Sequence, residues 1–297
     1  MNSEILFLFE VILSGLFSGS LYSIIAVGFV LIYKASGVFN FAQGAMVVFA
    51  AQLYATLSAA GLNSLVAAFV SIGSMILIAI LVEFLVLRRM INQTQTTLFM
   101  ATIGVAFVLD GVAQWMFGSN IRQINIALPN GMFEVGGMLI DQSDVAAAAI
   151  SAGLIFALYG LLTFTSIGRS LRAVADDQQA AVSVGAPVHR IWMLVWANAG
   201  ILAFVTGLIW GAKLGAQPAL AMITLKALPV IILGGLTSVP GAIVGGLIIG
   251  VGERVFEVYL GSEFGGATES WFPYLVAICF LAIRPQGLFG ELPIRRI

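Results

Sequence analysis

Long apolar runs, separated by short polar segments, occupy almost the whole chain. Nine such runs can be distinguished, at about 8–33, 38–58, 62–87, 97–117, 145–166, 191–212, 222–236, 241–257 and 271–284. A helix needs about 20 apolar residues to cross the hydrocarbon core of a bilayer. Such runs are helical because backbone groups in lipid need hydrogen-bond partners within their own segment. The pattern predicts an all-α, polytopic membrane protein with about nine transmembrane or re-entrant helices.

The seventh and eighth runs leave two topologies open. The seventh, 222–236, is short, and the residues LTSVPG that follow it at 236–241 have the composition of a turn. The two runs form either two crossings or one re-entrant hairpin, which would leave seven full crossings. In both cases the sequence predicts a single transmembrane domain over residues 1–297, without a soluble domain of useful size.

Arginine and lysine predict the orientation, because these residues concentrate on the cytoplasmic side of membrane proteins. With the N-terminus outside, nine of the 13 basic residues fall on the inner side: Lys34, Arg88, Arg89, Arg169, Arg172, Arg190, Arg284, Arg295 and Arg296. The outer side receives the acidic loops 118–144 and 258–270. Both topologies give the same sidedness. We therefore expect the N-terminus outside and the C-terminus in the cytoplasm.

Composition supports a membrane protein and excludes several other classes. The chain is 60% hydrophobic and 9% charged, with a mean hydropathy of +1.06, whereas about 25% of the residues in soluble domains are charged. The single cysteine, Cys279, allows neither a disulfide framework nor a zinc site. The N-terminus MNSEILFLFE has no basic region, so a cleaved signal peptide is not expected.

Pairs of glycines at GxxxG spacing recur in the apolar runs. They are Gly15/Gly19, Gly207/Gly211, Gly241/Gly245 and Gly246/Gly250. Such pairs allow the backbones of two helices to approach closely. We expect them to pack a tight bundle or a seam between two subunits.

One polar segment interrupts the apolar pattern between the fifth and sixth runs. Residues 168–190 read GRSLRAVADDQQAAVSVGAPVHR, and the predicted orientation places the loop 167–190 in the cytoplasm. The spacing predicts a helix from Ser170 to Val184, which Gly185 and Pro187 would end. One stripe of this helix carries Leu171, Val174, Ala175, Gln178, Ala181, Val182 and Gly185.

The chemistry of this stripe favours a protein groove over lipid. A helix that lies on a membrane surface shows large apolar side chains opposite clustered basic residues. This helix instead has small apolar residues and two adjacent aspartates, which suit a close-packed contact with a polar rim. A plain cytoplasmic connector is the alternative.

Polar side chains within apolar runs are candidates for a translocation path, because they are costly in lipid. The candidates are Asn40, Gln43, Asp110, Lys226 and Glu253. Each also has a structural alternative: a helix-start cap for the first two, and a bond to a neighbouring helix for the two acids. Lys226 would either meet a solute carboxylate or extend its ammonium outward. Glu83, close to Arg88 and Arg89, is expected to anchor a helix end at the interface.

Three stretches resemble the permease subunits of branched-chain amino acid ABC importers. They are GVFNFAQGAM (37–46), GRSLRAVADDQQAAVSVGAP (168–187) and ITLKALPVIILGGLTSVPGAIVGGLIIGVGE (223–253). Together with similar spacing of the runs, the resemblance covers essentially the whole chain. In the first stretch Gln43 stands where the family usually has histidine, and Ala45 where it usually has glutamate.

The resemblance implies an importer subunit in the bacterial inner membrane. It would move branched-chain or related amino acids, or similar small polar solutes, by alternating access. The implied partners are two cytoplasmic ATPases, a second related permease or a second copy, a periplasmic substrate-binding protein and the lipid bilayer, with no nucleic acid. The polar segment would be the coupling helix that contacts an ATPase, through Arg169, Arg172, Asp176, Asp177, Gln178, Ala181, Gly185 and Pro187.

The residues themselves agree that ATP hydrolysis belongs to other subunits. A P-loop needs a lysine directly after a glycine, and none of the three lysines of this chain follows one. We therefore expect a transport subunit that is no enzyme and that needs no cofactor of its own. The alternative is a secondary transporter or channel without an ATPase, which would carry several paired buried carboxylates or a polar-lined broken helix.

Overall fold

The computed structural model describes residues 2–90, 93–126, 129, 131–176, 181, 183 and 188–290. Contacts gather the chain into two compact units. Unit 1 comprises Met1–Val30, Ala127–Phe156 and Lys226–Ile297, and unit 2 comprises Leu31–Ile126 and Ala157–Leu225. Two long helices, α1 (Asn2–Ser36) and α5 (Gln142–Phe164), contribute to both units.

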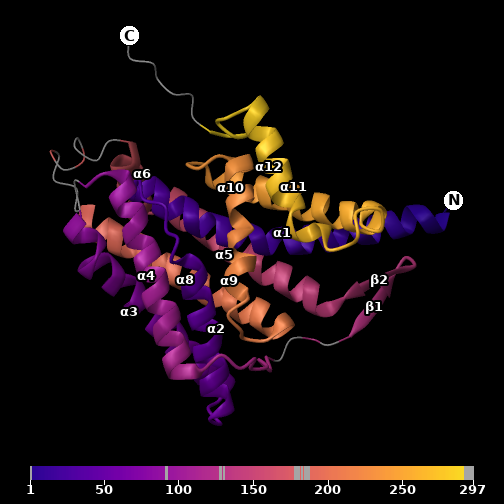
Figure 1. Cartoon of the computed structure of the whole chain (residues 1–297), viewed down its shortest axis with the longest axis horizontal. Coiled ribbons are helices and arrows are strands. Elements are labelled where there is room, and N and C mark those ends of the chain that lie inside the picture. Colours follow the sequence, from indigo (N-terminus) through magenta and orange to yellow (C-terminus); the bar gives the residue numbers. More distant parts are fainter. Residues whose placement is uncertain are drawn as a thin grey trace. The chain divides into compact units, whose positions relative to one another are not determined.

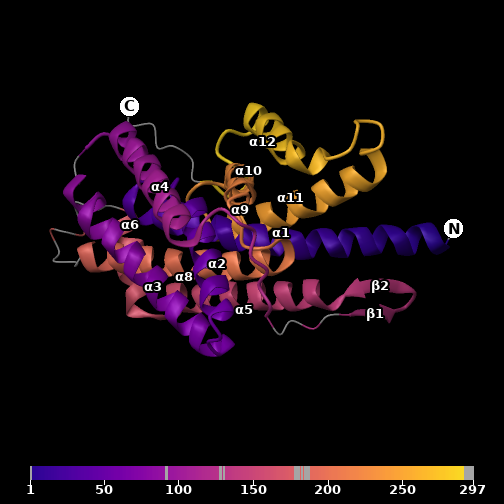
Figure 2. The same ribbon diagram turned by 60° about the horizontal axis from the view of Figure 1, so that its bottom comes forward.

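Unit 1 pairs the first half of α1 with helices from the end of the chain, and α1 runs beside α11 (Figure 1). Its further elements are β1 (Met132–Val135), β2 (Met138–Asp141), α10 (Ala227–Gly234), α11 (Val239–Leu260), η2 (Thr268–Ser270) and α12 (Phe272–Ile283). The strands form an antiparallel hairpin that leads into α5 (Figure 2). Its two-residue turn, Gly136-Gly137, has positive φ at both positions, as a type I′ hairpin turn requires.

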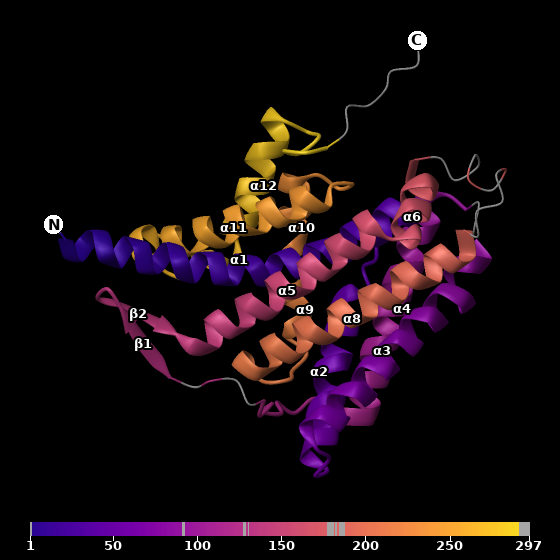
Figure 3. The same cartoon turned by 180° about the vertical axis from the view of Figure 1, so that it is seen from behind.

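Unit 2 is a helical bundle in which α8 packs against both α2 and α3, while α4 packs against α2 (Figure 3). Its elements are α2 (Gln43–Ala59), α3 (Ser64–Leu85), η1 (Leu87–Met90), α4 (Gln95–Phe117), α6 (Ser166–Asp176), α8 (Val188–Leu214) and α9 (Leu220–Leu225). Side-chain caps mark the helix starts: Asn63 accepts from the amide of Leu65 at 2.9 Å, and Thr94 from that of Thr97 at 3.3 Å.

Each of the predicted apolar runs coincides with a helix, which confirms a helical membrane protein. Within the described residues, six helices are long and apolar enough to cross a membrane: Glu4–Ser36, Ser64–Met90, Gln95–Phe117, Gln142–Phe164, Val188–Leu214 and Val239–Leu260. The second run forms the 17-residue helix α2, and the last forms the short helix α12. The seventh run is divided at Lys226 into α9 and α10. The number of crossings and the orientation stay predictions.

The helix of the polar segment begins earlier than predicted. It starts at Ser166 instead of Ser170, directly after α5 ends at Phe164. The reason is Thr165, whose side-chain oxygen accepts from the amide of Gly168 at 3.2 Å and so caps the new helix. The sequence pattern placed the start too late because it followed the apolar stripe and overlooked this cap.

The predicted glycine pairs all form contacts within the chain. A β-carbon at Gly15 would lie 2.6 Å from the Cα of Val251 in α11, and one at Gly19 would lie 2.6 Å from the carbonyl oxygen of Gly246. The helices α1 and α11 are therefore antiparallel and nearly touch along their backbones. Contacts just as close join Gly245 to α10 and Gly207 to α2. All four pairs therefore pack helices within this chain, which was one of the two alternatives, the other being a seam between subunits.

We expect Gly19→Leu to destabilise the protein, because the neighbouring atoms are backbone of α11 and cannot move aside. The loss should reach at least about 3 kcal/mol, the upper range for overpacked sites. Gly153→Leu on α5 is the matched control, since a β-carbon there has no neighbour within 4 Å. Thermal unfolding in detergent measures both. Equal losses in the two variants would contradict the packing described here.

Candidate functional site

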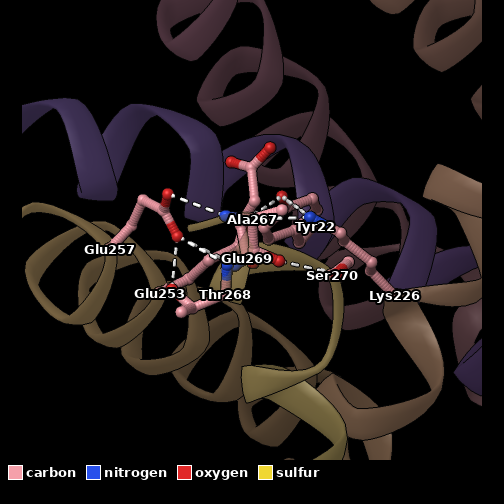
Figure 4. Close-up of polar contacts among 8 residues, drawn as sticks. All are labelled: Tyr22, Lys226, Glu253, Glu257, Ala267, Thr268, Glu269 and Ser270. Carbon is pink, nitrogen blue, oxygen red and sulfur yellow. Dashed lines mark hydrogen bonds and ion pairs between the residues drawn. The ribbon is translucent and has the colours of Figure 1, made fainter. Parts of the chain in front are cut away.

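A buried ion pair within unit 1 joins the break in the seventh run to α11. Lys226 Nζ lies 2.9 Å from Glu253 Oε1, and the hydroxyl of Tyr22 in α1 donates to the same oxygen at 3.0 Å (Figure 4). The side chains of Lys226 and Glu253 are 15% and 5% exposed. The ammonium also lies 5.6 Å from the centre of the Tyr22 ring, within the range of a cation–π contact. Three helical segments are thus held by one carboxylate oxygen.

Proline explains why the seventh run breaks at Lys226. Pro229 has no amide hydrogen to donate to the carbonyl of Leu225, four residues earlier, and its ring would clash with that carbonyl. Accordingly α9 ends at Leu225 and α10 begins at Ala227. The sequence analysis treated residues 222–236 as one continuous run and overlooked Pro229, which indicates the break.

The antiparallel packing of α1 and α11 explains how Tyr22 reaches Glu253. Side chains on a helix lean toward its N-terminus. In an antiparallel pair, Tyr22 therefore leans along α11 toward its C-terminal end, and Glu253 leans back toward it. Their partnership spans 231 residues of sequence, so no local pattern could have indicated it.

The pair changes what Lys226 and Glu253 can do. Glu253 does bond to a neighbouring helix, which was one of its two alternatives, and of the two alternatives for Lys226 the outward extension is not found. A solute carboxylate that approached Lys226 would compete with Glu253 for the ammonium. The second carboxylate oxygen, Glu253 Oε2, is buried without a hydrogen-bond donor among the described residues. A role for either residue in a translocation path stays a prediction.

One helical turn beyond Glu253, Glu257 fastens the loop that follows α11. Its carboxylate accepts from the amides of Ala267 at 3.2 Å, Thr268 at 2.7 Å and Glu269 at 3.3 Å (Figure 4). It also accepts from the Thr268 hydroxyl. Ala267 has the left-handed φ of 54°, which the three surrounding bonds hold in place. The sequence analysis missed this clamp, although Glu257 shares a helix face with Glu253.

Asn40 and Gln43 are fully buried, and their side chains form a hydrogen bond with one another. Asn40 Nδ2 donates to Gln43 Oε1 at 3.1 Å, and Asn40 Oδ1 accepts from the amide of Ala42 at 3.0 Å. Gln43 Nε2 donates to the carbonyl of Ala199 in α8 at 3.2 Å. The two side chains thus shape the start of α2 and tie it to α8, which favours the structural alternative over a polar lining.

Asp110 differs from the other path candidates because no described residue forms a hydrogen bond or ion pair with it. It lies half-buried in α4, a helix that packs mainly against α2. Only 11% of the most apolar 18-residue stretch of α4 is buried. An unpaired carboxylate within a membrane helix is costly, and the role of Asp110 in a translocation path stays a prediction. Asp110 is therefore the path candidate whose whole carboxylate is without a partner among the described residues.

The prediction that Glu83 anchors a helix end at the interface is wrong, because Glu83 is completely buried. It follows Ser71, Met75 and Ala79 at intervals of four residues, all buried along one face of α3. This face packs against α8, where a β-carbon at Gly200 would lie 2.7 Å from the carbonyl oxygen of Met75. The nearby arginines suggested an exposed position, but the helix face decides burial. Both carboxylate oxygens lack a hydrogen-bond partner within the described residues.

In the polar segment, part of the apolar stripe is buried against the chain itself. Leu171 and Val174 are 4% and 2% exposed, and α6 packs against α8. Ala181 is also buried. The outward face carries Arg169 and Arg172, and Arg172 Nη1 donates to the carbonyl of Leu162 at the end of α5.

The predicted ATPase contacts are therefore only partly described. Asp176 is the last residue of α6, while Asp177, Gln178, Gly185 and Pro187 lie outside the described residues. Among the described residues of the stripe, Leu171, Val174 and Ala181 are buried, so the exposed face of α6 is the polar one; the contact with an ATPase stays a prediction. Elsewhere in the described chain, no cluster of three or more His, Cys, Asp or Glu side chains could hold a metal ion.

Removing one partner of the buried pair should destabilise the protein more than removing both. We expect Lys226→Met to cost about 3–5 kcal/mol, because it leaves Glu253 charged and buried. The double variant Lys226→Met/Glu253→Met should lose less than Lys226→Met alone, and Tyr22→Phe about 1 kcal/mol. Thermal unfolding in detergent measures each, with exposed Glu263→Gln as the control. Strictly additive losses would show that the pair is not coupled.

Comparisons with known proteins agree on one family. A family model described as "Branched-chain amino acid transport system / permease component" matches residues 11–283. The high-affinity branched-chain amino acid transport system permease protein LivH of Salmonella typhimurium is 26% identical over the whole of both chains. The corresponding protein BraD of Pseudomonas aeruginosa is 25% identical over 99% of each.

More distant similarities extend to other transport proteins. The ribose import permease protein RbsC of Escherichia coli is 26% identical over 73% of this chain and 66% of its own. Among solved structures, PsaBC from Streptococcus pneumoniae in complex with Fab gives a TM-score of 0.48 at 16% identity, over 91% of this chain and 89% of that chain. That score is too low to carry an argument. The family match extends from the first turns of α1 to the end of α12, and this chain belongs to the family of permease components of branched-chain amino acid transport systems.

Proposed function

We propose that this chain is a membrane-spanning subunit of an ATP-driven importer for branched-chain or related amino acids. The observation that carries the proposal is the family match over residues 11–283, which includes every long apolar helix and the polar segment between α5 and α8. The partners would be two cytoplasmic ATPases, a second permease and a periplasmic substrate-binding protein. The membrane would be the inner membrane of a bacterium.

The proposed topology has nine crossings, with the N-terminus outside. Support comes from the turn between α10 and α11. Helix α11 has 22 residues and is long enough to cross the membrane, so its start would lie at the inner surface. The chain after α12 would also be cytoplasmic, and it contacts this turn: the amides of Leu288 and Phe289 donate to the carbonyls of Leu233 and Gly234. This contact supports two crossings over a re-entrant hairpin, whose turn would lie within the membrane.

The solute path would involve the buried polar groups in different ways. Asp110 offers a carboxylate that no described residue engages. The pair of Lys226 and Glu253 offers opposite charges, and Glu253 Oε2 has no donor within the described chain. An amino acid is a zwitterion, so it would match such a pair if the ion pair opens during transport. Asn40 and Gln43 would keep the start of α2 in place beside the path.

Uptake by a reconstituted complex tests the proposed function. The chain is purified together with the two proposed ATPases, the second permease and the binding protein, and the complex is placed in proteoliposomes. We expect uptake of labelled leucine, isoleucine or valine that requires both ATP and the binding protein, because this chain has no lysine placed for a P-loop. Leucine accumulation by this chain alone under an ion gradient would instead establish a secondary transporter.

The exposed face of α6 would contact an ATPase, and charge reversal tests that contact. We expect Arg169→Glu to reduce ATPase copurification and solute-stimulated ATP hydrolysis at least about tenfold, because a like charge at a polar interface costs several kcal/mol. Glu263→Lys, an exposed reversal in the loop after α11, is the control and should leave both unchanged. A normal ATPase content with Arg169→Glu would remove α6 from the interface.

A further inference from the structure

A groove in unit 2 lies between the consecutive helices α3 and α4, and its volume is about 490 Å³. Both helices pack against α2 but barely contact one another. The floor is formed by Val82, Val105 and Leu109, which are buried. Its rim includes Leu81, Leu85 and Val108, which are 42%, 48% and 65% exposed. The described lining is entirely apolar.

Gly104 keeps this groove deep. It belongs to the lining, and a β-carbon added there would have no neighbour within 4 Å. Consecutive helices joined by a short connection normally pack against one another and cover such a surface. Here the apolar surface stays open, although both helices are among those long enough to cross the membrane.

One end of the groove is positively charged. Leu85 and Val86 line that end, and η1 follows directly with Arg88, half-buried, and Arg89, exposed. The guanidinium of Arg88 lies 5.5 Å from the centre of the Phe84 ring, which holds it near the end of α3. Helix α4 begins at Gln95 and contacts η1, so its unpaired amides and helix dipole add positive potential there.

Glu83 offsets part of the charge of Arg88, because the two side chains interact electrostatically. The one acidic residue of α3 is Glu83, whose carboxylate is completely buried on the face that packs against α8. No described acid forms a salt bridge with Arg88 or Arg89. The groove therefore combines a long apolar body with a cationic end.

We propose that this groove binds an anionic phospholipid, with an acyl chain between α3 and α4 and the phosphate on Arg88 and Arg89. A single phospholipid molecule supplies both an apolar chain and an anion at the required end. Basic pockets between transmembrane helices on the cytoplasmic side are the kind of site that binds anionic headgroups. A helix of a partner subunit would cover the apolar body but would leave the two arginines without an anion. The proposal does not depend on which solute is transported.

Lipid titration of the purified full-length protein tests this site. The protein in mild detergent is titrated with phosphatidylglycerol or phosphatidylcholine, and bound lipid is counted by native mass spectrometry. We expect one tightly bound phosphatidylglycerol per chain and at least about tenfold weaker binding of phosphatidylcholine. Arg88→Gln/Arg89→Gln should weaken phosphatidylglycerol about 30-fold, at about 1 kcal/mol for each arginine near the headgroup, and should leave phosphatidylcholine unchanged.

A second variant acts on the apolar body instead of the charge. Gly104→Leu fills the groove and should weaken both lipids, whereas Gly111→Leu should weaken neither. Gly111 is the matched control because it lies on the same helix, also has no neighbour within 4 Å, and is outside the lining. The proposal is overturned if both lipids bind equally well to the native protein. It is also overturned if phosphatidylglycerol binds Gly104→Leu and the arginine variant as tightly as the native protein, or if the variant Val108→Cys crosslinks to a partner permease in place of lipid.

Discussion

Apolar side chains cannot by themselves hold helices together in a bilayer, because lipid tails are as apolar as the side chains are. Close backbone contact and polar bonds between helices must therefore fix the arrangement. In unit 1 the glycines of α1 and α11 supply the contact, and the Ser23 hydroxyl adds a bond to the carbonyl of Ile243 at 3.0 Å. In unit 2, Gly207 does the same between α8 and α2. The positions of the polar side chains follow from these contacts.

The ion pair of Lys226 and Glu253 depends on this close approach. The α1–α11 contact brings Tyr22 within reach of Glu253, and Pro229 breaks the seventh run so that Lys226 stands between two helices. A buried charge without a partner would be costly, so the carboxylate stabilises the break as long as the ammonium stays in place. A broken helix beside a polar pair is also what secondary transporters use at their solute sites. Here the two charges already neutralise one another, so separating them would cost free energy.

The sequence predicted the helices well because membrane spans need long apolar runs whatever their partners are. It also identified the residues that matter in the seventh and eighth runs, Lys226 and Glu253, although their pairing with Tyr22 could not be read from a separation of 231 residues. Glu83 shows the opposite case. Its neighbours in sequence suggested the interface, but its position on the same face as Ser71 and Ala79 turns it toward α8. Which face packs is a tertiary property, and it decides whether a polar residue is buried, paired or exposed.

The polar segment shows the same distinction between composition and packing. Its apolar stripe suggested a surface for a partner, yet Leu171 and Val174 are buried and α6 packs against α8. This attachment is useful for a coupling element, since a helix that is pushed by an ATPase transmits force only if its other face is fixed to the bundle. Helix α8 is in turn fixed to α2 by Gly207 and to α3 by Gly200. A displacement of α6 would therefore move the α2–α3–α8 bundle as a whole, which is the mechanical link that the proposed contact of α6 with an ATPase would need.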